Sequence, residues 1–156
     1  MIQSRRNFLK TATYVGVATA AISSGILIPQ RALGAYNAAA FQAEDVGGAM
    51  KASLGSDQHS ASDQIKLKAP DIAENGAVVP LTVSSDLENV DSISLIVAGN
   101  PFPLTSTYSL SGGAQPFIST RVKMGKTSDV IAVVKSNGKL YSTTKEVKVT
   151  IGGCGG

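Results

Sequence analysis

The chain has 156 residues, enough for one ordinary domain, and its 43% hydrophobic content is that of a globular protein rather than a disordered one. Its formal charge of +3 and its pI near 9.1 would suggest a nucleic-acid partner only if the basic residues belonged to the folded part of the chain. Whether a nucleic-acid partner is excluded therefore depends on where the basic residues lie along the chain.

Residues 1–34 have the form of a cleaved export signal. The pair Arg5-Arg6 in "SRRNFLK" is typical of twin-arginine signals. The apolar stretch that follows is diluted by Ala, Thr, Ser and Gly, which makes it weaker than a spanning helix of about 20 strongly apolar residues. "RALGA" offers a small-residue cleavage site, so we predict cleavage after Gly34 or Ala35. An uncleaved N-terminal membrane anchor is the alternative.

Loss of this segment changes the charge of the protein. It removes four basic residues and no acidic residue, so ten basic side chains remain against 11 acidic ones, a formal charge of −1. A chain so balanced has no electrostatic reason to bind DNA, RNA or an anionic membrane surface. We therefore predict a mature protein in the bacterial periplasm, exported by the twin-arginine pathway in folded form, with no nucleic-acid partner and no stable membrane anchoring.

Residues 35–60 predict an N-terminal helix and a linker. Helix-forming Ala, Gln, Glu, Met and Lys are frequent over 36–54, and apolar residues recur there close to helical spacing. The pair Gly47-Gly48 weakens the middle of this helix by about 1 kcal/mol per glycine relative to alanine. The polar stretch "GSDQHSASD" that follows reads as the linker.

Residues 61–151 alternate apolar and polar side chains with period two, which predicts β-strands. Asn137-Gly138 predicts a tight hairpin, because both positions of such a turn require positive φ. Pro80 predicts an edge strand or a bulge. The pattern as a whole predicts an all-β, immunoglobulin-like antiparallel β-sandwich preceded by a short helix. The eight predicted strands lie in "QIKLKAP", "VVPLTVSS", "SISLIVAG", "STYSL", "FISTRVKM", "DVIAVVKS", "LYSTT" and "EVKVTI".

Residue counts exclude several kinds of catalytic and metal centre. The single histidine, His59, falls in the linker, whereas a blue-copper site requires two histidines and structural zinc normally draws four ligands from Cys and His. No phosphate-binding glycine motif is present. We predict no catalytic residue, no metal and no cofactor. A couple between His59 and the chain's cysteine is the alternative to a solvent-exposed histidine.

Two other groups of residues have a functional and a simpler interpretation. Arg121 and Lys123 lie on one face of a predicted strand and could bind an anion, although a solvent-facing pair is the simpler interpretation. Phe102 in "NPFP" could present an exposed aromatic ring to a partner, although a rigid turn requires no function.

The only cysteine, Cys154, lies between two glycine pairs in the terminal "GGCGG". It has no cysteine to pair with in its own chain, which in an oxidising compartment implies an intermolecular partner or a reactive thiol. The terminal carboxylate two residues away disfavours a thiolate, so partner enzymes would have to activate it. Residues 152–156 therefore predict a flexible, swinging arm rather than a frayed end with an incidental cysteine. Its glycines, which restrict the backbone little, are Gly152, Gly153, Gly155 and Gly156.

"APDIAENGAVVPLTV", "NPFPL", "STRVKM" and above all "VKVTIGGCGG" resemble the SoxY family, the sulfur-carrier subunits of periplasmic thiosulfate-oxidising (Sox) systems. The likeness runs from about residue 40 to the C-terminus. It implies a heterodimer with a SoxZ-like β-sandwich subunit. It also implies that Cys154 holds thiosulfonate and sulfane sulfur, including a persulfide, and presents them to SoxAX-, SoxB- and sulfane-dehydrogenase-type enzymes.

Two other functions stay open. Gly155-Gly156 is similar to the end of ubiquitin-like carriers that hold sulfur as a C-terminal thiocarboxylate. Those carriers act in the cytoplasm and wrap a sheet around a central helix, so the export signal and the succession of strands oppose this function. The second is an exported β-sandwich binding module whose cysteine cross-links it to a partner.

Overall fold

The computed structural model describes residues 36–111 and 113–150. The predicted signal peptide and the predicted arm of residues 152–156 lie outside the described residues, so both stay predictions. In the part of the chain that is described, no helix is long and apolar enough to cross a membrane.

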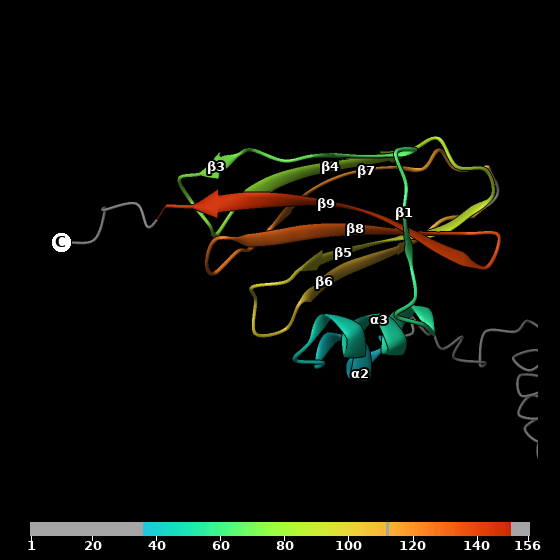
Figure 1. Ribbon diagram of the computed structural model, residues 1–156, viewed down its shortest axis with the longest axis horizontal. Helices are drawn as coiled ribbons and strands as arrows, with labels where there is room; N and C mark the ends of the chain where they lie inside the picture. Colours follow the sequence, from blue (N-terminus) through green and yellow to red (C-terminus); the bar gives the residue numbers. More distant parts are fainter. Residues whose placement is uncertain (1–35, 112, 151–156) are drawn as a thin grey trace, which may run out of the picture. The chain divides into compact units, whose positions relative to one another are not determined.

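Seven main strands of the described chain form two sheets packed face to face (Figure 1). The smaller sheet has the order β2-β4-β7 and the larger the order β9-β8-β5-β6, and all pairs among these strands are antiparallel. The first, second and fifth main strands thus share one sheet, which is an immunoglobulin-like arrangement and confirms the predicted fold class. The strands are β2 (Ile65–Lys68), β4 (Val79–Ser85), β5 (Val90–Val97), β6 (Leu104–Ser109), β7 (Phe117–Val122), β8 (Ser128–Ser136) and β9 (Lys139–Val149).

The strand count differs from the prediction in two respects. The runs "LYSTT" and "EVKVTI" form the single long strand β9, because no turn-forming residue separates them. Two further strands of two residues each, β1 (Ser60–Ala61) and β3 (Ile72–Ala73), pair in parallel with β9. The stretch predicted as a linker therefore contributes a strand to the larger sheet.

The predictions for the Asn137-Gly138 turn and for Pro80 had different outcomes. Asn137 and Gly138 have φ values of 50° and 74° and join β8 to β9 as predicted. Pro80 lies in β4, the central strand of its sheet, so the edge-strand prediction is wrong. The sheet tolerates the proline because β2 ends at Lys68, opposite Thr82, which leaves β4 with one hydrogen-bonded neighbour at Pro80.

The main core lies between the two sheets. Alternate side chains of β4 and β5 point into it, and those of β5 include Ile93, Leu95 and Val97, all fully buried. At about 25 cal/mol per Å² of apolar surface removed from water, this layer is the main source of stability.

The N-terminal segment forms two helices, α2 (Ala38–Phe41) and α3 (Val46–Leu54), so the prediction of one helix over 36–54 is wrong. The interruption falls before Asp45 rather than at Gly47-Gly48. Asp45 has extended backbone geometry, and its carboxylate accepts a hydrogen bond from the amide of Gly48 at 2.7 Å, which makes it the N-cap of α3. A β-carbon at Gly48 would lie 2.8 Å from that carboxylate, so the glycine provides room for the cap.

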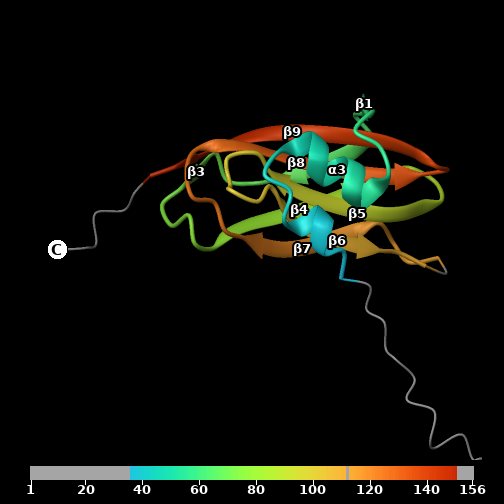
Figure 2. The same ribbon diagram turned by 90° about the horizontal axis from the view of Figure 1, so that it is seen from below.

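The helices cover the outer face of the larger sheet, opposite the sandwich core (Figure 2). Met50 and Leu54 of α3 pack with Ile96 of β5 and Val133 of β8. Both faces of β5 and β8 are therefore buried, which explains why these strands are apolar almost throughout rather than strictly alternating.

Candidate functional site at the end of β9

The predicted site residues fall outside the part of the chain that the structure describes. These residues are Cys154, the glycines beside it, and Arg5 and Arg6 of the export signal. What the structure does describe is the point from which the predicted arm begins, at the C-terminal end of β9 (Figure 1). We call this point, with β3 and the loops 74–78, 98–103 and 123–127 around it, the arm base.

The last residues of β9 have hydrogen-bond partners on both sides. On one side the amides of Lys148 and Thr150 donate to the carbonyls of Asp71 and Ala73, at 3.0 and 3.1 Å. On the other side the amide of Val149 donates to Thr127 Oγ1 at 2.9 Å. This side chain takes the place of β8, whose first residue pairs two positions earlier. The backbone is thus fixed up to the last described residue.

An ion pair fastens the segment before β3 to the middle of β9. Lys145 Nζ lies 2.9 Å from Asp71 Oδ1 and donates a hydrogen bond to the carbonyl of Ala69 at 2.6 Å. The hydrogen bond from Lys145, then its charge and that of Lys148, hold the pKa of the Asp71 carboxyl below its ordinary value of 3.8. Because Asp71 is exposed, this pair fixes geometry more than it adds stability.

Gly76 lets the loop 74–78 approach the end of β9. A β-carbon at this position would lie 2.4 Å from the carbonyl oxygen of Met124 and 2.8 Å from Val149 Cγ1. The Gly76 carbonyl accepts a hydrogen bond from the Met124 amide at 2.7 Å. Only a residue without a side chain allows this contact among three segments.

Asn100 fastens the two remaining loops of the arm base to each other. Its Nδ2 donates to the carbonyl of Lys123 at 2.7 Å, and its Oδ1 accepts from the amide of Gly125 at 3.0 Å. A β-carbon on Gly99 would lie 2.6 Å from Cβ of Ser128, so the loop 98–103 is also in close contact with the first residue of β8. The end of β9 is therefore surrounded by loops that are joined to one another by hydrogen bonds and close contacts.

Large apolar side chains are exposed around this end of β9. Ile72, Val78 and Phe102 are 57%, 49% and 52% exposed, and they belong to β3 and to two of the arm-base loops. Large exposed apolar side chains of this kind are candidate contact residues for other proteins. The predicted exposure of Phe102 is confirmed, and a contact with a partner is a proposal taken up below.

His59 is exposed, as its position in the linker predicted, and it lies far from the arm base. Its Nδ1 is 2.7 Å from Ser142 Oγ. Ser142 precedes Val149 by seven residues, which corresponds to roughly 23 Å along a strand. Among the residues of known placement, no group of three His, Cys, Asp or Glu side chains is arranged to hold a metal ion.

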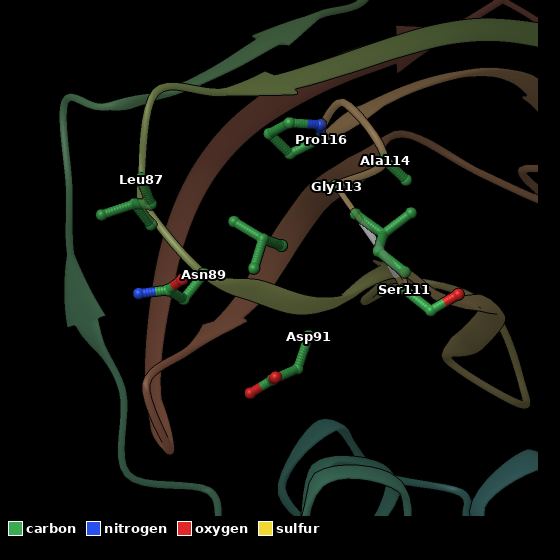
Figure 3. A pocket seen from close by; sticks show the side chains of 9 residues that line it. Leu87, Asn89, Asp91, Ser111, Gly113, Ala114 and Pro116 are labelled. Carbon is green, nitrogen blue, oxygen red and sulfur yellow. The ribbon is translucent and has the colours of Figure 1, made fainter.

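A cavity of about 440 Å³ opens at the end of the sandwich opposite the arm base (Figure 3). The loop after β4 contributes Leu87 and Asn89, and the loop before β7 contributes Ala114 and Pro116. Asp91 is its only ionisable lining residue. A single carboxylate, beside the uncharged polar side chains of Asn89 and Ser111, supplies no pair of acid and base, so this cavity offers no catalytic arrangement.

The sequence did not single out Asp71, Gly76 or Thr127, although each holds the arm base. "ENG" indicated a turn at Gly76, but its contact with Val149 joins segments 73 residues apart and left no local pattern. Thr127 gave no signal at all, because its role depends on where β8 begins.

Comparisons with known proteins match the chain to one family. The model of the family described as "Sulfur oxidation protein SoxY" matches residues 50–154. The sulfur carrier protein SoxY from Chlorobium limicola f. thiosulfatophilum is 38% identical, with a TM-score of 0.63 over 70% of this chain and 96% of that chain. The reeler domain of human F-spondin is 12% identical, with a TM-score of 0.41 over 60% and 93% of the two chains. No curated protein sequence matches.

Proposed function

The chain belongs to the SoxY family of sulfur oxidation proteins, and from this premise we propose that the thiol of Cys154 is the covalent attachment site for sulfur in thiosulfate oxidation. The family and the Chlorobium sulfur carrier support a carrier role in sulfur oxidation rather than an enzymatic one. The match to the family model extends to residue 154, so it includes the only cysteine.

The observation that carries the proposal is the bracing of β9 up to Thr150. Cys154 lies four positions beyond this fixed point, and an extended chain advances about 3.4 Å per residue, so the thiol can travel roughly 14 Å from the arm base. That reach is sufficient to enter a pocket of another protein while the sandwich stays outside it. The glycines on both sides of Cys154 add no side chains that would obstruct entry.

The proposed chemistry makes and breaks bonds at the cysteine sulfur. A haem enzyme removes two electrons as the thiol joins the outer sulfur of thiosulfate, which releases the thiol proton and forms a cysteine S-thiosulfonate. A hydrolase then adds water across the bond between sulfur and the sulfonate group, which releases sulfate and leaves a persulfide. A sulfane dehydrogenase, where present, oxidises the remaining sulfur. The carrier supplies the attachment point, and its partners supply the redox and acid–base groups.

We further propose that the chain is exported to the periplasm by its twin-arginine signal and that it pairs with a SoxZ-like subunit. The arginine pair in the first residues supports the route. The exposed side chains of Ile72, Val78 and Phe102 support transient contacts between the arm base and the enzymes that load and unload the thiol.

Intact-mass spectrometry of the protein purified from its own periplasm without reductant tests the proposal. We expect an N-terminus near Ala35 and adducts of sulfur or thiosulfate that reductant removes. Cys154→Ser should lose every adduct and keep both its fold and its partner, since the proposed arm adds nothing to the sandwich core. A bare thiol, or a plain disulfide dimer as the only species in cells that are oxidising thiosulfate, would contradict a carrier and favour a cross-linking binding module.

A further inference from the structure

A cleft of about 470 Å³ opens between β6 and β7, each of which is an edge strand of its sheet. No other described strand pairs with the outer edge of either. The cleft reaches the arm base through Lys123, whose carbonyl is held by Asn100 and whose neighbour Met124 is hydrogen-bonded to Gly76. It is therefore distinct from the cavity at the opposite end of the sandwich.

The charged residues that line this cleft are all basic. Arg121 and Lys123 line it, and no acidic residue does. Three described lysines, Lys51, Lys66 and Lys145, are each paired with an aspartate, but no described carboxylate pairs with Arg121 or Lys123. Two unneutralised cations beside low-dielectric walls concentrate positive potential in a cleft and attract anions.

A hydroxyl without a partner lies beside the cleft. Ser106 lines it from β6, and its Oγ is shielded from solvent and makes no hydrogen bond. The neighbouring Thr105 differs, because its Oγ1 donates to the carbonyl of Leu95 at 2.9 Å. A buried hydroxyl that lacks an acceptor costs free energy unless a ligand or an ordered water satisfies it. Ser106 thus provides an unused hydrogen-bond donor near Arg121 and Lys123, which have no carboxylate partner among the described residues.

We propose that the β6–β7 cleft binds a small divalent oxyanion, of the class that includes thiosulfate and sulfate, without covalent attachment. The Arg121 guanidinium binds two of its oxygens, the Lys123 ammonium neutralises the second charge, and the Ser106 hydroxyl donates to it as the surrounding side chains adjust. The choice of a sulfur oxyanion rests on the proposed function. The site itself rests on the cations, the absence of lining carboxylates and the unpartnered hydroxyl.

Titration of the Cys154→Ser protein with thiosulfate tests the cleft separately from covalent loading. We would use the exported full chain, together with any subunit that stays bound to it, and follow amide shifts of β6 and β7 by NMR and heats by calorimetry. We expect saturable binding that weakens roughly tenfold in Arg121→Gln, and several-fold in Lys123→Gln and Ser106→Ala. Lys68→Gln is the matched control, because it removes an exposed, unpaired charge at the opposite edge of the same sheet and should leave binding unchanged.

Parallel titrations with sulfate and chloride at equal ionic strength identify the ligand. Tighter binding of thiosulfate indicates a substrate site, and equal binding of sulfate and thiosulfate indicates a site for any tetrahedral sulfur oxyanion. Equal binding of chloride, or equal losses in Lys68→Gln and Arg121→Gln, would overturn the proposal. Loss of the partner subunit in Arg121→Gln without saturable anion binding would also overturn it, in favour of a protein interface. None of these outcomes bears on loading of Cys154, which the mass measurement tests.

Discussion

At the end of the sandwich where β9 finishes, hydrogen bonds fasten three loops to one another, whereas at the opposite end the loops between strands line an open cavity. Asn100 and Thr127 bridge loops of the arm base to their neighbours, and Gly76 brings a third loop against Val149. The opposite end has the Asn137-Gly138 hairpin, a cavity and the solvent-exposed His59.

The two ends therefore differ in what they offer to chemistry. The end with the histidine has the cavity, yet the cysteine that we propose as the sulfur attachment site follows the other end in sequence. A carrier needs a firm starting point for its terminal segment and open access around it. Bracing of the backbone, rather than a pocket, is the feature that distinguishes the end of the fold from which the proposed arm begins.

Gly76→Ala should give the largest effect, because the new methyl group would meet the Met124 carbonyl and Val149. We expect a loss of about 3 kcal/mol in the free energy of unfolding, measured by urea denaturation. Gly138→Ala is the matched change at the other end, where φ is 74° and no atom lies near the new methyl group. Backbone strain alone should cost about 1 kcal/mol there. Equal losses would mean that the arm base is no more tightly packed than the hairpin.

Gly153→Leu tests access rather than bracing. We expect an unchanged free energy of unfolding and a roughly tenfold slower loading of the thiol by partner enzymes, because a bulky neighbour obstructs entry of Cys154 into their pockets. Single-turnover loading, followed by mass spectrometry, measures the rate. Ala114→Leu, at an exposed position of the opposite end, controls for added apolar surface and should leave the rate unchanged. Loss of stability in Gly153→Leu would contradict the prediction that the arm lies outside the core.

Thr127→Val removes the acceptor of the Val149 amide and keeps the shape of the side chain. An unsatisfied amide should cost about 1 kcal/mol, and hydrogen exchange at Val149 should accelerate by roughly fivefold. Thr127→Ser retains the hydroxyl and should restore the protection. If Thr127→Val and Thr127→Ser gave the same exchange rate at Val149, the end of β9 would be held by its pairing with β3 alone.

The smallest effect concerns the Asp71–Lys145 pair. Its stabilising contribution is present above the ordinary aspartate pKa of 3.8 and disappears as the pH falls through the lower pKa of the folded state. Lys145→Gln should raise the Asp71 pKa towards 3.8, as measured by NMR titration of the carboxyl group. The pKa of Asp57, which is lowered chiefly by its hydrogen bond with Lys51, should not change. A shift of both values would point to a global change rather than a local pair.

Local chemistry made much of the fold predictable. Period-two alternation located the main strands, and the Asn137-Gly138 pair located a hairpin whose φ values it requires. Pro80 misled because strand order and the length of β2 are not local properties. The helix break was missed because a cap at Asp45 competes with helix propensity, and propensity alone cannot rank the two.

The residue types of the candidate site could be predicted from the sequence. The contacts that hold the end of β9 in place could not. The sequence identified Cys154 between its glycines, and it also indicated that Phe102 could be exposed. The contacts that hold the end of β9 join segments far apart in the chain, so no periodicity or motif in the sequence predicts them. The same holds for the β6–β7 cleft, where Arg121 was noticed but Ser106 was not.

The position of β9 in the chain sets the order in which this protein can be completed. β9 pairs with β8, β1 and β3 and contributes fully buried Val147 to the core, yet it is the last of the described strands to leave the ribosome. The sandwich must therefore wait in an unfinished state, with the edge of β8 open, until the segment that precedes the thiol has been synthesised. If the chain uses the proposed export route, which accepts only folded cargo, closure of this strand would act as a check that translation has passed β9.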